Sequence, residues 1–491
     1  MTISLTRPFS APEPPAPADH PPRGSATSSG GSRFLFPILA FGGVFQAVLQ
    51  TVMVPLLPSM PGFTGASLQS VSWLITTTLL VGAVVTPIFG RLADMVGKKR
   101  MLLVAFILMT AGSVLCAVTS DIALLIFARG LQGAGAAVIP IGISILRDEL
   151  PREKVNRAIA TMSSTLGIGT ALGLPFAATI AEYSNWHMLF WVTTGIGVAV
   201  TTAAFLCIRE SEVRSGGRFD GAGAVGLTAA LVCLLVPITQ GSSWGWASPA
   251  VLSMFASAVF LFLLWGYQQL HNKNPLIDLQ VSARRTVLLP HVTALLVGFA
   301  FYGNALITTQ LLQAPRDGAG YGLTIVQAAI CQLPTSVAMI IFAQVGSRMS
   351  ERVGAKVTIL AGAVCLVAGY SIHTVPDKGL WLLVLALGIA AIGTALVYST
   401  LPMLIVWAVP SQQMAAANGV NVLLRTMGTT MCSAVVATIL AAGMVGDTAS
   451  PGGFSAAYAV CGVLSMLVFA VALALPAHAK AAKSSAEPIV T

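Results

Sequence analysis

Long apolar segments separated by short polar links follow one another along almost the whole chain. Each segment, as a helix rising about 1.5 Å per residue, is long enough to cross a hydrocarbon layer of about 30 Å. Because a backbone in hydrocarbon must satisfy its own hydrogen bonds, we predict an all-α, polytopic membrane protein. Its fourteen predicted transmembrane helices begin near Phe34, Val71, Met101, Ile122, Arg157, His187, Ala222, Pro249, Val287, Leu323, Val357, Leu380, Ala415 and Phe454.

The composition supports this class of protein. The 491 residues are 56% hydrophobic and only 9% charged, with a mean hydropathy of +0.84, whereas soluble domains carry about 25% charged residues. All seven cysteines lie at scattered spacings inside the apolar segments, which excludes a zinc knuckle or a disulfide framework. We therefore expect no metal site and no cofactor.

The charge distribution predicts the orientation in the membrane. The net charge of +9 comes from cations that cluster in alternate links, a pattern that indicates membrane orientation rather than nucleic-acid binding. With the N-terminus inside, the cytoplasmic links and tails hold about 22 of the 26 Lys and Arg residues. The external links hold Arg316 and Lys378, and Arg129 and Arg425 fall within spans. Both termini are therefore predicted to be cytoplasmic.

The two ends of the chain are predicted to be tails. Residues 1–33 are rich in Pro, Ala, Ser and Gly, a composition that cannot bury a core, so we expect a disordered cytoplasmic tail. The apolar segment that follows is too long for a signal peptide and lacks a cleavage site. Residues 476–491 are predicted to form a second cytoplasmic tail.

A charged link at residues 90–100, Gly-Arg-Leu-Ala-Asp-Met-Val-Gly-Lys-Lys-Arg, joins the second and third spans. A generic cytoplasmic link would explain its four cations but neither Gly90 and Gly97 nor Asp94. A weaker copy at 347–356, with Glu351 in place of Asp94, follows the tenth span. An offset of eight spans predicts two six-helix bundles, 34–208 and 287–475, with two linking helices in 209–286.

This pattern resembles the loop signature of the major facilitator superfamily, and the layout resembles its fourteen-helix drug:proton antiporter branch. The segment Asn-Pro-Leu-Ile-Asp-Leu at 274–279 also looks like that branch's link into the second half. The resemblance implies alternating access at the interface of two rocking halves. It also implies a cytoplasmic conformational latch made of Gly90, Arg91, Asp94, Gly97 and Arg100, with Glu351 and Arg352 as weaker counterparts.

Two further segments resemble signatures of the same family. The first, Arg129 to Ala137, carries Gln132, Gly130 and Gly133; the resemblance links Arg129 and Gln132 to proton coupling. The second, Gly167 to Ala178, resembles the exporter signature but places Leu174 in the usual proline slot and replaces a glycine pair by alanines. Small residues in both segments allow neighbouring helices to approach closely. We assign this packing role to Gly130, Gly133, Gly169, Gly173 and Pro175.

No acidic residue lies deep in a predicted span, and Gln46 and Gln50 stand where many fourteen-helix antiporters carry a carboxylate. Proton exchange needs a group whose pKa differs between two states. The candidates are Asp94 and Glu182, with Asp121 and the poorer candidate His187 also near helix ends. A purely structural role for Arg129 remains the alternative.

Polar residues within the spans predict a substrate cavity. Asn418 and Asn421 share one helical face with Arg425, which indicates a cavity rather than lipid; hydrogen bonding between helices is the alternative. The absence of buried carboxylates favours neutral or anionic amphiphiles. The other candidate cavity residues are Gln46, Gln50, Tyr302, Asn304, Gln310, Gln327, Gln332 and Tyr398.

The sequence thus predicts a non-enzymatic secondary transporter of a bacterial cytoplasmic membrane. We expect a monomer that exports a hydrophobic or amphiphilic small molecule, such as an antibiotic, in exchange for protons and in contact with membrane lipids. No Gly-x-x-x-x-Gly-Lys-Ser/Thr loop is present, which argues against direct use of ATP. The alternative within transport is a lipid or secreted-metabolite exporter or flippase without proton coupling. A membrane-embedded enzyme and a polytopic sensor are the alternatives outside transport. The enzyme would need catalytic groups that converge within the spans, and the sensor would need a soluble signalling domain; the sequence indicates neither.

Overall fold

The computed structural model describes residues 32–53, 56, 59–183, 185–211, 214–316, 320–375, 379–445 and 448–475. Both predicted terminal tails lie almost entirely outside these residues. The first eight helices are α1 (Ser32–Thr51), α2 (Met60–Thr64), α3 (Leu68–Val96), α4 (Lys98–Val118), α5 (Ile122–Gly133), α6 (Val138–Glu149), α7 (Arg152–Tyr183) and α8 (Trp186–Cys207). A short 3-10 helix, η2 (Ala134–Ala137), joins α5 to α6, and the three run as one span.

The second part of the chain repeats this organisation after two linking helices. Its helices are α9 (Gly221–Trp244), α10 (Pro249–His271), α11 (Leu279–Ser282), α12 (Arg285–Gln313), α13 (Ile325–Arg352), α14 (Ala355–His373), α15 (Leu380–Ala408), α16 (Met414–Ala442) and α17 (Pro451–Leu473). A 3-10 turn, η3 (Ser411–Gln413), precedes α16. A small antiparallel ladder, β1 (Met444–Val445) with β2 (Thr448–Ala449), is the β structure of the described residues.

The predicted all-α, polytopic fold is confirmed. Every predicted span start lies within five residues of the start of a long helix, the largest difference being Arg157 against Arg152. Within the described residues, thirteen helical segments are long and apolar enough to cross a membrane. The fifth predicted span, near Arg157, corresponds to α7, which is not among these thirteen segments. This helix has charged residues at its start and many Ser, Thr and Gly residues along it. The count of fourteen spans and the domain boundaries stay predictions.

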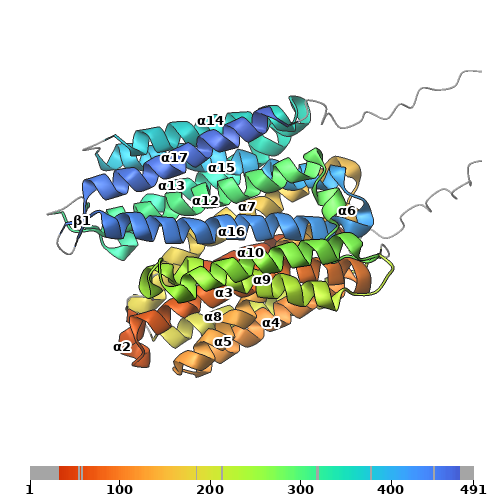
Figure 1. Ribbon diagram of the computed structural model, residues 1–491, viewed down its shortest axis with the longest axis horizontal. Helices are drawn as coiled ribbons and strands as arrows, with labels where there is room; N and C mark the ends of the chain where they lie inside the picture. Colours follow the sequence, from red (N-terminus) through yellow and green to blue (C-terminus); the bar gives the residue numbers. More distant parts are fainter. Residues whose placement is uncertain are drawn as a thin grey trace, which may run out of the picture.

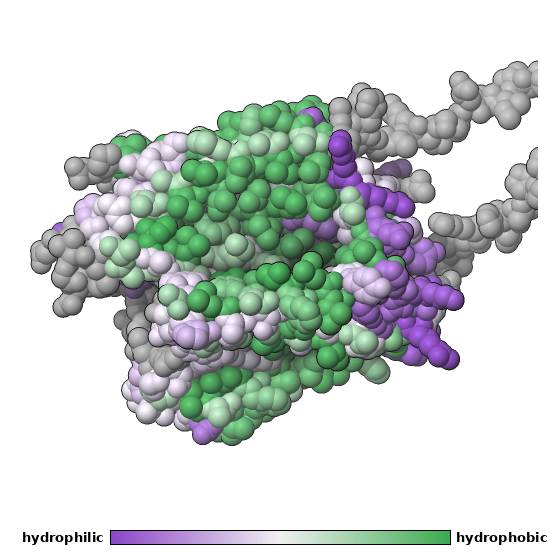
Figure 2. All heavy atoms as spheres, viewed as in Figure 1, coloured by the Kyte–Doolittle hydropathy of each residue, from purple (hydrophilic) through white to green (hydrophobic). Residues whose placement is uncertain are grey.

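The long helices run side by side in two groups (Figure 1). The first group contains α1 and α3 to α8, and the second contains α12 to α17. Their main contacts are α3 against α16 and α7 against α13, with smaller contacts of α7 with α15 and of α6 with α16. Helix α9 packs beside the α3–α16 contact. Apolar side chains cover the flanks of the molecule, and hydrophilic residues gather at one end, as Figure 2 shows. This surface is what a helix bundle in hydrocarbon requires.

Small residues bring the helices of the first group close together. A Cβ at Gly133 would lie 2.6 Å from the Thr78 carbonyl oxygen of α3. Gly169 and Gly173 of α7 press against Ala47 and Thr51 of α1, and Gly130 faces the Thr77 side chain. The side chain of Pro175 is outside the described set.

Candidate transport site

A cavity of about 620 Å³ lies between the two groups of helices, within the range of about 300–1,000 Å³ that is typical of ligand pockets. Its walls come from the C-terminal turns of α1, the first half of α3, the second half of α12 and the first turns of α13. The middle of α16 closes it on one side. The cavity therefore extends from the centre of the bundle toward the end where α1 and α12 finish.

The cavity contains seven of the eleven residues predicted to line it: Gln46, Gln50, Tyr302, Gln310, Gln332, Tyr398 and Arg425. The amide of Gln332 donates to Thr309 at 2.9 Å. Most of the remaining wall is apolar. No Asp or Glu is among the described residues that line it.

Arg129 is fully buried on α5 and faces this cavity. Its Nη1 donates to the Leu49 carbonyl at 3.0 Å and to Gln132 Oε1, and its Nε donates to the Leu74 carbonyl at 3.3 Å. All of these acceptors are neutral. Because a buried guanidinium costs about 3 kcal/mol or more in hydrocarbon, these bonds are needed to hold it there.

Gln132 extends the Arg129 network, since its Nε2 donates to Ser113 Oγ at 3.1 Å. The residues assigned to coupling on α5 are thus joined to each other and, through Leu49 and Leu74, to α1 and α3. Arg129 Nη2 has no hydrogen-bond partner among the described residues. The buried cation therefore has one donor group that no described residue satisfies.

Arg425 enters the cavity from α16 and lies over the ring of Tyr398, 5.2 Å from its centroid. This geometry is that of a cation–π contact. Phe301 stands beside Tyr398 with ring centroids 5.7 Å apart. Arg425 thus has an aromatic rather than an anionic neighbour.

The four remaining predicted substrate residues lie outside the cavity. Asn304 is buried against α15 and donates to the Leu387 carbonyl at 3.4 Å. Gln327 completes a capping box with Thr324 at the start of α13. Asn418 and Asn421 donate to the carbonyls of Met414 and Pro290. The two asparagines do share the stripe of Arg425, but Asn418 bonds within α16 and Asn421 contacts α12, and neither lines the cavity.

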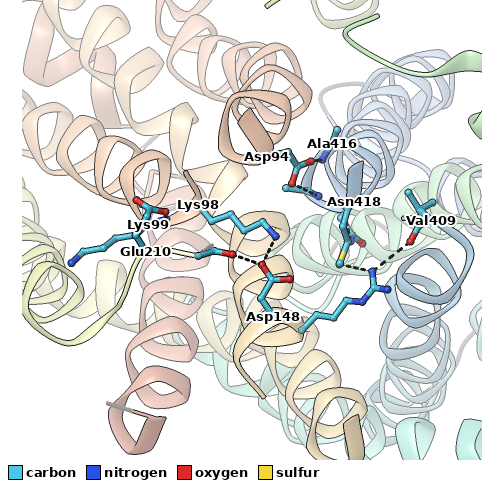
Figure 3. Close-up of polar contacts among 12 residues, drawn as sticks. Asp94, Lys98, Lys99, Asp148, Glu210, Val409, Ala416 and Asn418 are labelled. Carbon is cyan, nitrogen blue, oxygen red and sulfur yellow. Dashed lines mark hydrogen bonds and ion pairs between the residues drawn. The ribbon is translucent and has the colours of Figure 1, made fainter. Parts of the chain in front are cut away.

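The predicted latch lies near the C-terminal end of α3, whereas the cavity is lined by the first half of that helix. Figure 3 shows the polar contacts of Asp94 and its surroundings. Asp94, near the end of α3, is buried and accepts hydrogen bonds from the backbone N–H groups of Ala415 at 3.3 Å and Ala416 at 3.0 Å. A carboxylate at a helix N-terminus satisfies free N–H groups and interacts favourably with the helix dipole. Gly90 allows this approach, because a Cβ there would lie 2.6 Å from the Ala415 carbonyl oxygen.

Two other charged residues of the link, Arg91 and Arg100, have partners in the segment that follows α8. Arg91 donates to Ser215 at 3.2 Å, and exposed Arg100 lies 3.8 Å from Glu210. The Glu210 carboxylate also accepts from the backbone N–H groups of Lys99 and Arg100, so it caps α4. Gly97 has a φ of 134° at this junction.

Three contacts at this end were missed by sequence reasoning. Lys98 is buried and forms an ion pair with Asp148 at 2.5 Å. Arg147 Nη1 lies 3.5 Å from the Val409 carbonyl oxygen and 3.3 Å from Met414 Sδ, bridging to the second half. Arg147, a cation in the last turn of α6 shortly before a proline, could have been chosen as a candidate from the sequence. No sequence feature, however, indicates that its partners are Val409 and Met414.

The second copy of the link repeats the backbone but not the contacts. Gly354 has a positive φ of 97° before α14, and Gly97 likewise has a positive φ, of 134°, before α4. Glu351 and Arg352, however, are exposed and form no hydrogen bond or ion pair through their side chains with the described residues. The structure thus does not bring them into a counterpart of the Asp94 contact.

The remaining coupling candidates lie near helix ends. Asp121 caps α5 by accepting from Leu124 at 2.9 Å, and His187 contacts Ser120 and Asn185. The side chain of Glu182 lies outside the described set. Neither Asp121 nor His187 lines the cavity.

Two helical groups around a cavity that is closed at one end define a polytopic membrane transporter. The model of the Major Facilitator Superfamily matches residues 39–431, and the chain belongs to that family.

Relatives and a solved structure agree with this assignment. The multidrug resistance protein Stp of Mycobacterium tuberculosis is 29% identical over 413 residues, covering 83% of this chain and 76% of Stp. The probable actinorhodin transporter of Streptomyces coelicolor is 29% identical over 415 residues, covering 82% of this chain and 71% of that protein. The crystal structure of the human organic anion transporter MFSD10 (TETRAN) aligns with a TM-score of 0.67 at 14% identity, over 90% of this chain and 99% of that one. The last likeness concerns the fold alone.

Proposed function

We propose that this protein is a secondary active transporter that exports a hydrophobic or amphiphilic, antibiotic-like compound by alternating access. The observation that carries the proposal is the cavity between the two halves, largely apolar and with polar groups at Gln46, Arg129, Tyr398 and Arg425. The similar proteins, a multidrug resistance protein and a probable actinorhodin transporter, support the same class of substrate.

The proposed orientation places both termini and the Asp94 latch on the cytoplasmic side of a bacterial inner membrane. The hydrophilic residues that gather at one end support this choice, because cytoplasmic links carry an excess of Lys and Arg (Figure 2). The cavity then faces outward while the Asp94–α16 contact closes the inner end.

In the proposed cycle, the bundles 34–208 and 287–475 rock about the cavity and break the latch to open inward. Asn418 and Asn421 continue the Arg425 stripe toward the closed end, so they become the inner wall when that end opens. The chain works as a monomer among membrane lipids.

We assign proton exchange to Arg129 and Gln132, with Asp94 and Glu182 as the carboxylates that can titrate near the two ends. The support is the contact of Arg129 with both the cavity and the carbonyls of two helices. Protonation that alters this network changes the stability of one access state relative to the other.

The test is flux in reconstituted vesicles, comparing neutral, anionic and cationic aromatic amphiphiles with and without an imposed pH gradient. We expect flux of at least one class above that of protein-free vesicles, accelerated by the gradient. Vesicles that contain the Asp94→Asn variant, in which the latch contact is weakened, show how much of the measured flux depends on the latch. Flux equal to protein-free vesicles for every class contradicts the transport function, and flux that ignores the gradient contradicts the exchange.

A further inference from the structure

Two cations, Arg129 and Arg425, face the central cavity, and no described residue of its wall carries a negative charge to balance them. Arg129 bonds only to carbonyls and to the Gln132 amide, and Arg425 bonds to no described residue but stacks on Tyr398. No acidic residue is among the described residues of the cavity wall. Because removing charges from water is costly unless they are paired, such an arrangement is most stable when an anion enters.

Three buried polar atoms on this wall also lack partners among the described residues: Gln46 Oε1, Arg129 Nη2 and Tyr398 Oη. Two of them, the Arg129 N–H and the Tyr398 O–H, can donate to an oxyanion. They come from the two different halves, on α5 and α15. An anion in the cavity would therefore be contacted by donors from both halves.

The rest of the wall suits an aromatic body. Phe301, Tyr302 and Tyr398 form an aromatic surface next to Arg425, and the wall beyond it is mostly apolar. A flat ring system can pack there while its charged group reaches the guanidinium groups. A cationic ring system would meet two like charges and no carboxylate.

We propose that the substrates of this transporter are amphiphilic organic anions, a ring system bearing a carboxylate or a comparable oxyanion, which Arg425 and Arg129 bind from the two halves. This inference rests on the proposed function and narrows its substrate class. Arg425 is a specificity residue in this scheme, because it contacts the anionic group and has no other hydrogen-bond partner among the described residues. Arg129 binds the same group while held by Leu49 and Leu74.

The test uses three probes that share one ring system: 4-(1-pyrenyl)butyrate, its neutral butanamide and 4-(1-pyrenyl)butylammonium. Full-length protein in lipid nanodiscs is dialysed to equilibrium against each probe, with empty nanodiscs as the reference for partition into lipid. Charge-assisted hydrogen bonds are about twice as strong as neutral ones, so we expect the butyrate to bind about tenfold more tightly than the amide. The ammonium probe is expected to bind least.

Variants distinguish the cavity from general attraction to a basic protein. Arg425→Gln is expected to reduce butyrate affinity to that of the amide and to leave amide binding unchanged, whereas Arg425→Lys retains part of the preference. Arg285→Gln, at an exposed cation outside the cavity, is the matched control and is expected to keep the full preference.

Equal or weaker binding of the butyrate than of the amide, including no saturable binding of either, overturns the inference. A butyrate preference that persists in Arg425→Gln also overturns it. Vesicle flux distinguishes this inference from the proposed function. Flux without a preference for anions would support the transport function and contradict the anion specificity. Binding of anions without any flux would support the anion site and contradict the transport function.

Discussion

The carboxylate of Asp94, near the end of α3, accepts a 3.0 Å hydrogen bond from the backbone N–H of Ala416 in the first turn of α16. The two residues are 322 positions apart and belong to different halves of the molecule. This side chain thus helps to close one end of the interface through backbone groups of the other half, beside the contacts of Arg147 with Val409 and Met414. This contact requires only that position 416 present its N–H, which explains why no charged partner marks it in the sequence.

Asp94→Asn removes the charge and one of two acceptors at this helix terminus. Such contacts contribute about 1–2 kcal/mol, so we expect the closed inner end to weaken and the initial rate of flux to fall several-fold. The protein should still reach the membrane in normal amount, as measured by immunoblot. Glu351→Gln is the matched control in the second copy, with flux near that of the wild type. Normal flux in Asp94→Asn would remove the contact from the mechanism.

Gly90→Val tests the close approach of α3 to α16. Its Cβ would lie 2.6 Å from the Ala415 carbonyl oxygen, so the inner end cannot close without a shift. We expect a cysteine at position 421, buried at that end, to react faster with an impermeant maleimide from the cytoplasmic side. The background lacks the native cysteines. Gly388→Val, where a Cβ meets no atom within 4 Å, should leave the reaction rate unchanged; equal rates in both variants would show that this packing does not hold the end closed.

Arg129→Ala should abolish gradient-driven flux. It removes the donor to the Leu49 and Leu74 carbonyls and leaves Gln132 Oε1 without that partner, and each unsatisfied buried group costs about 1–3 kcal/mol. A fall in Tm is therefore expected as well. Arg129→Lys keeps the charge and should restore part of the flux. Unchanged flux in Arg129→Ala vesicles would show that Arg129 has only a structural role.

The stability of the linking helices is expected to depend on pH through Asp220, which caps the start of α9. Burial raises the pKa of Asp220, but hydrogen bonds from the Gly223 N–H at 2.8 Å and from the Gln269 and Gln268 amides outweigh it, so the pKa is lower than usual. A lowered folded-state pKa contributes stability that is present above the unfolded value, about 3.9, and is lost as pH falls through the folded value.

The Tm difference between wild type and Asp220→Asn should therefore be largest near neutral pH and shrink as the pH falls below about 4. Thermal unfolding in detergent across this range measures it. A difference that is constant with pH, or that grows in acid, would contradict the hydrogen-bonded, charged cap at the start of α9.

The fold was predictable because hydrocarbon imposes a simple pattern on the sequence. The start of α10 at Pro249 and that of α15 at Leu380 were located from apolar runs bounded by polar links. The least apolar helix, α7, was still placed to within five residues, because the spans on either side fixed the count. Helix–helix partners could be inferred only in outline from the repeat.

The cavity was predictable in part. Gln46, Gln50 and Arg425 stood out because polar side chains are costly in hydrocarbon. Asn418 and Asn421 share the helical face of Arg425. That shared face does not show which positions along α16 line the cavity and which lie in the closed part of the interface. The Gln327 side chain caps the N-terminus of its own helix, α13, instead of lining the cavity. The spacing Thr324-x-x-Gln327 is a capping-box pattern, which could have predicted this role from the sequence.

The central claim, that substrate crosses as the two halves rock apart at the inner end, is tested most directly by tying that end shut. Thr161 of α7 and Gln344 of α13 are in hydrogen-bond contact across the halves, at 2.5 Å. Thr161→Cys and Gln344→Cys, in a background without the seven native cysteines, can be joined by a short bis-methanethiosulfonate linker. We predict that the joined protein transports nothing and that reduction restores its flux; undiminished flux through the joined protein would contradict the account.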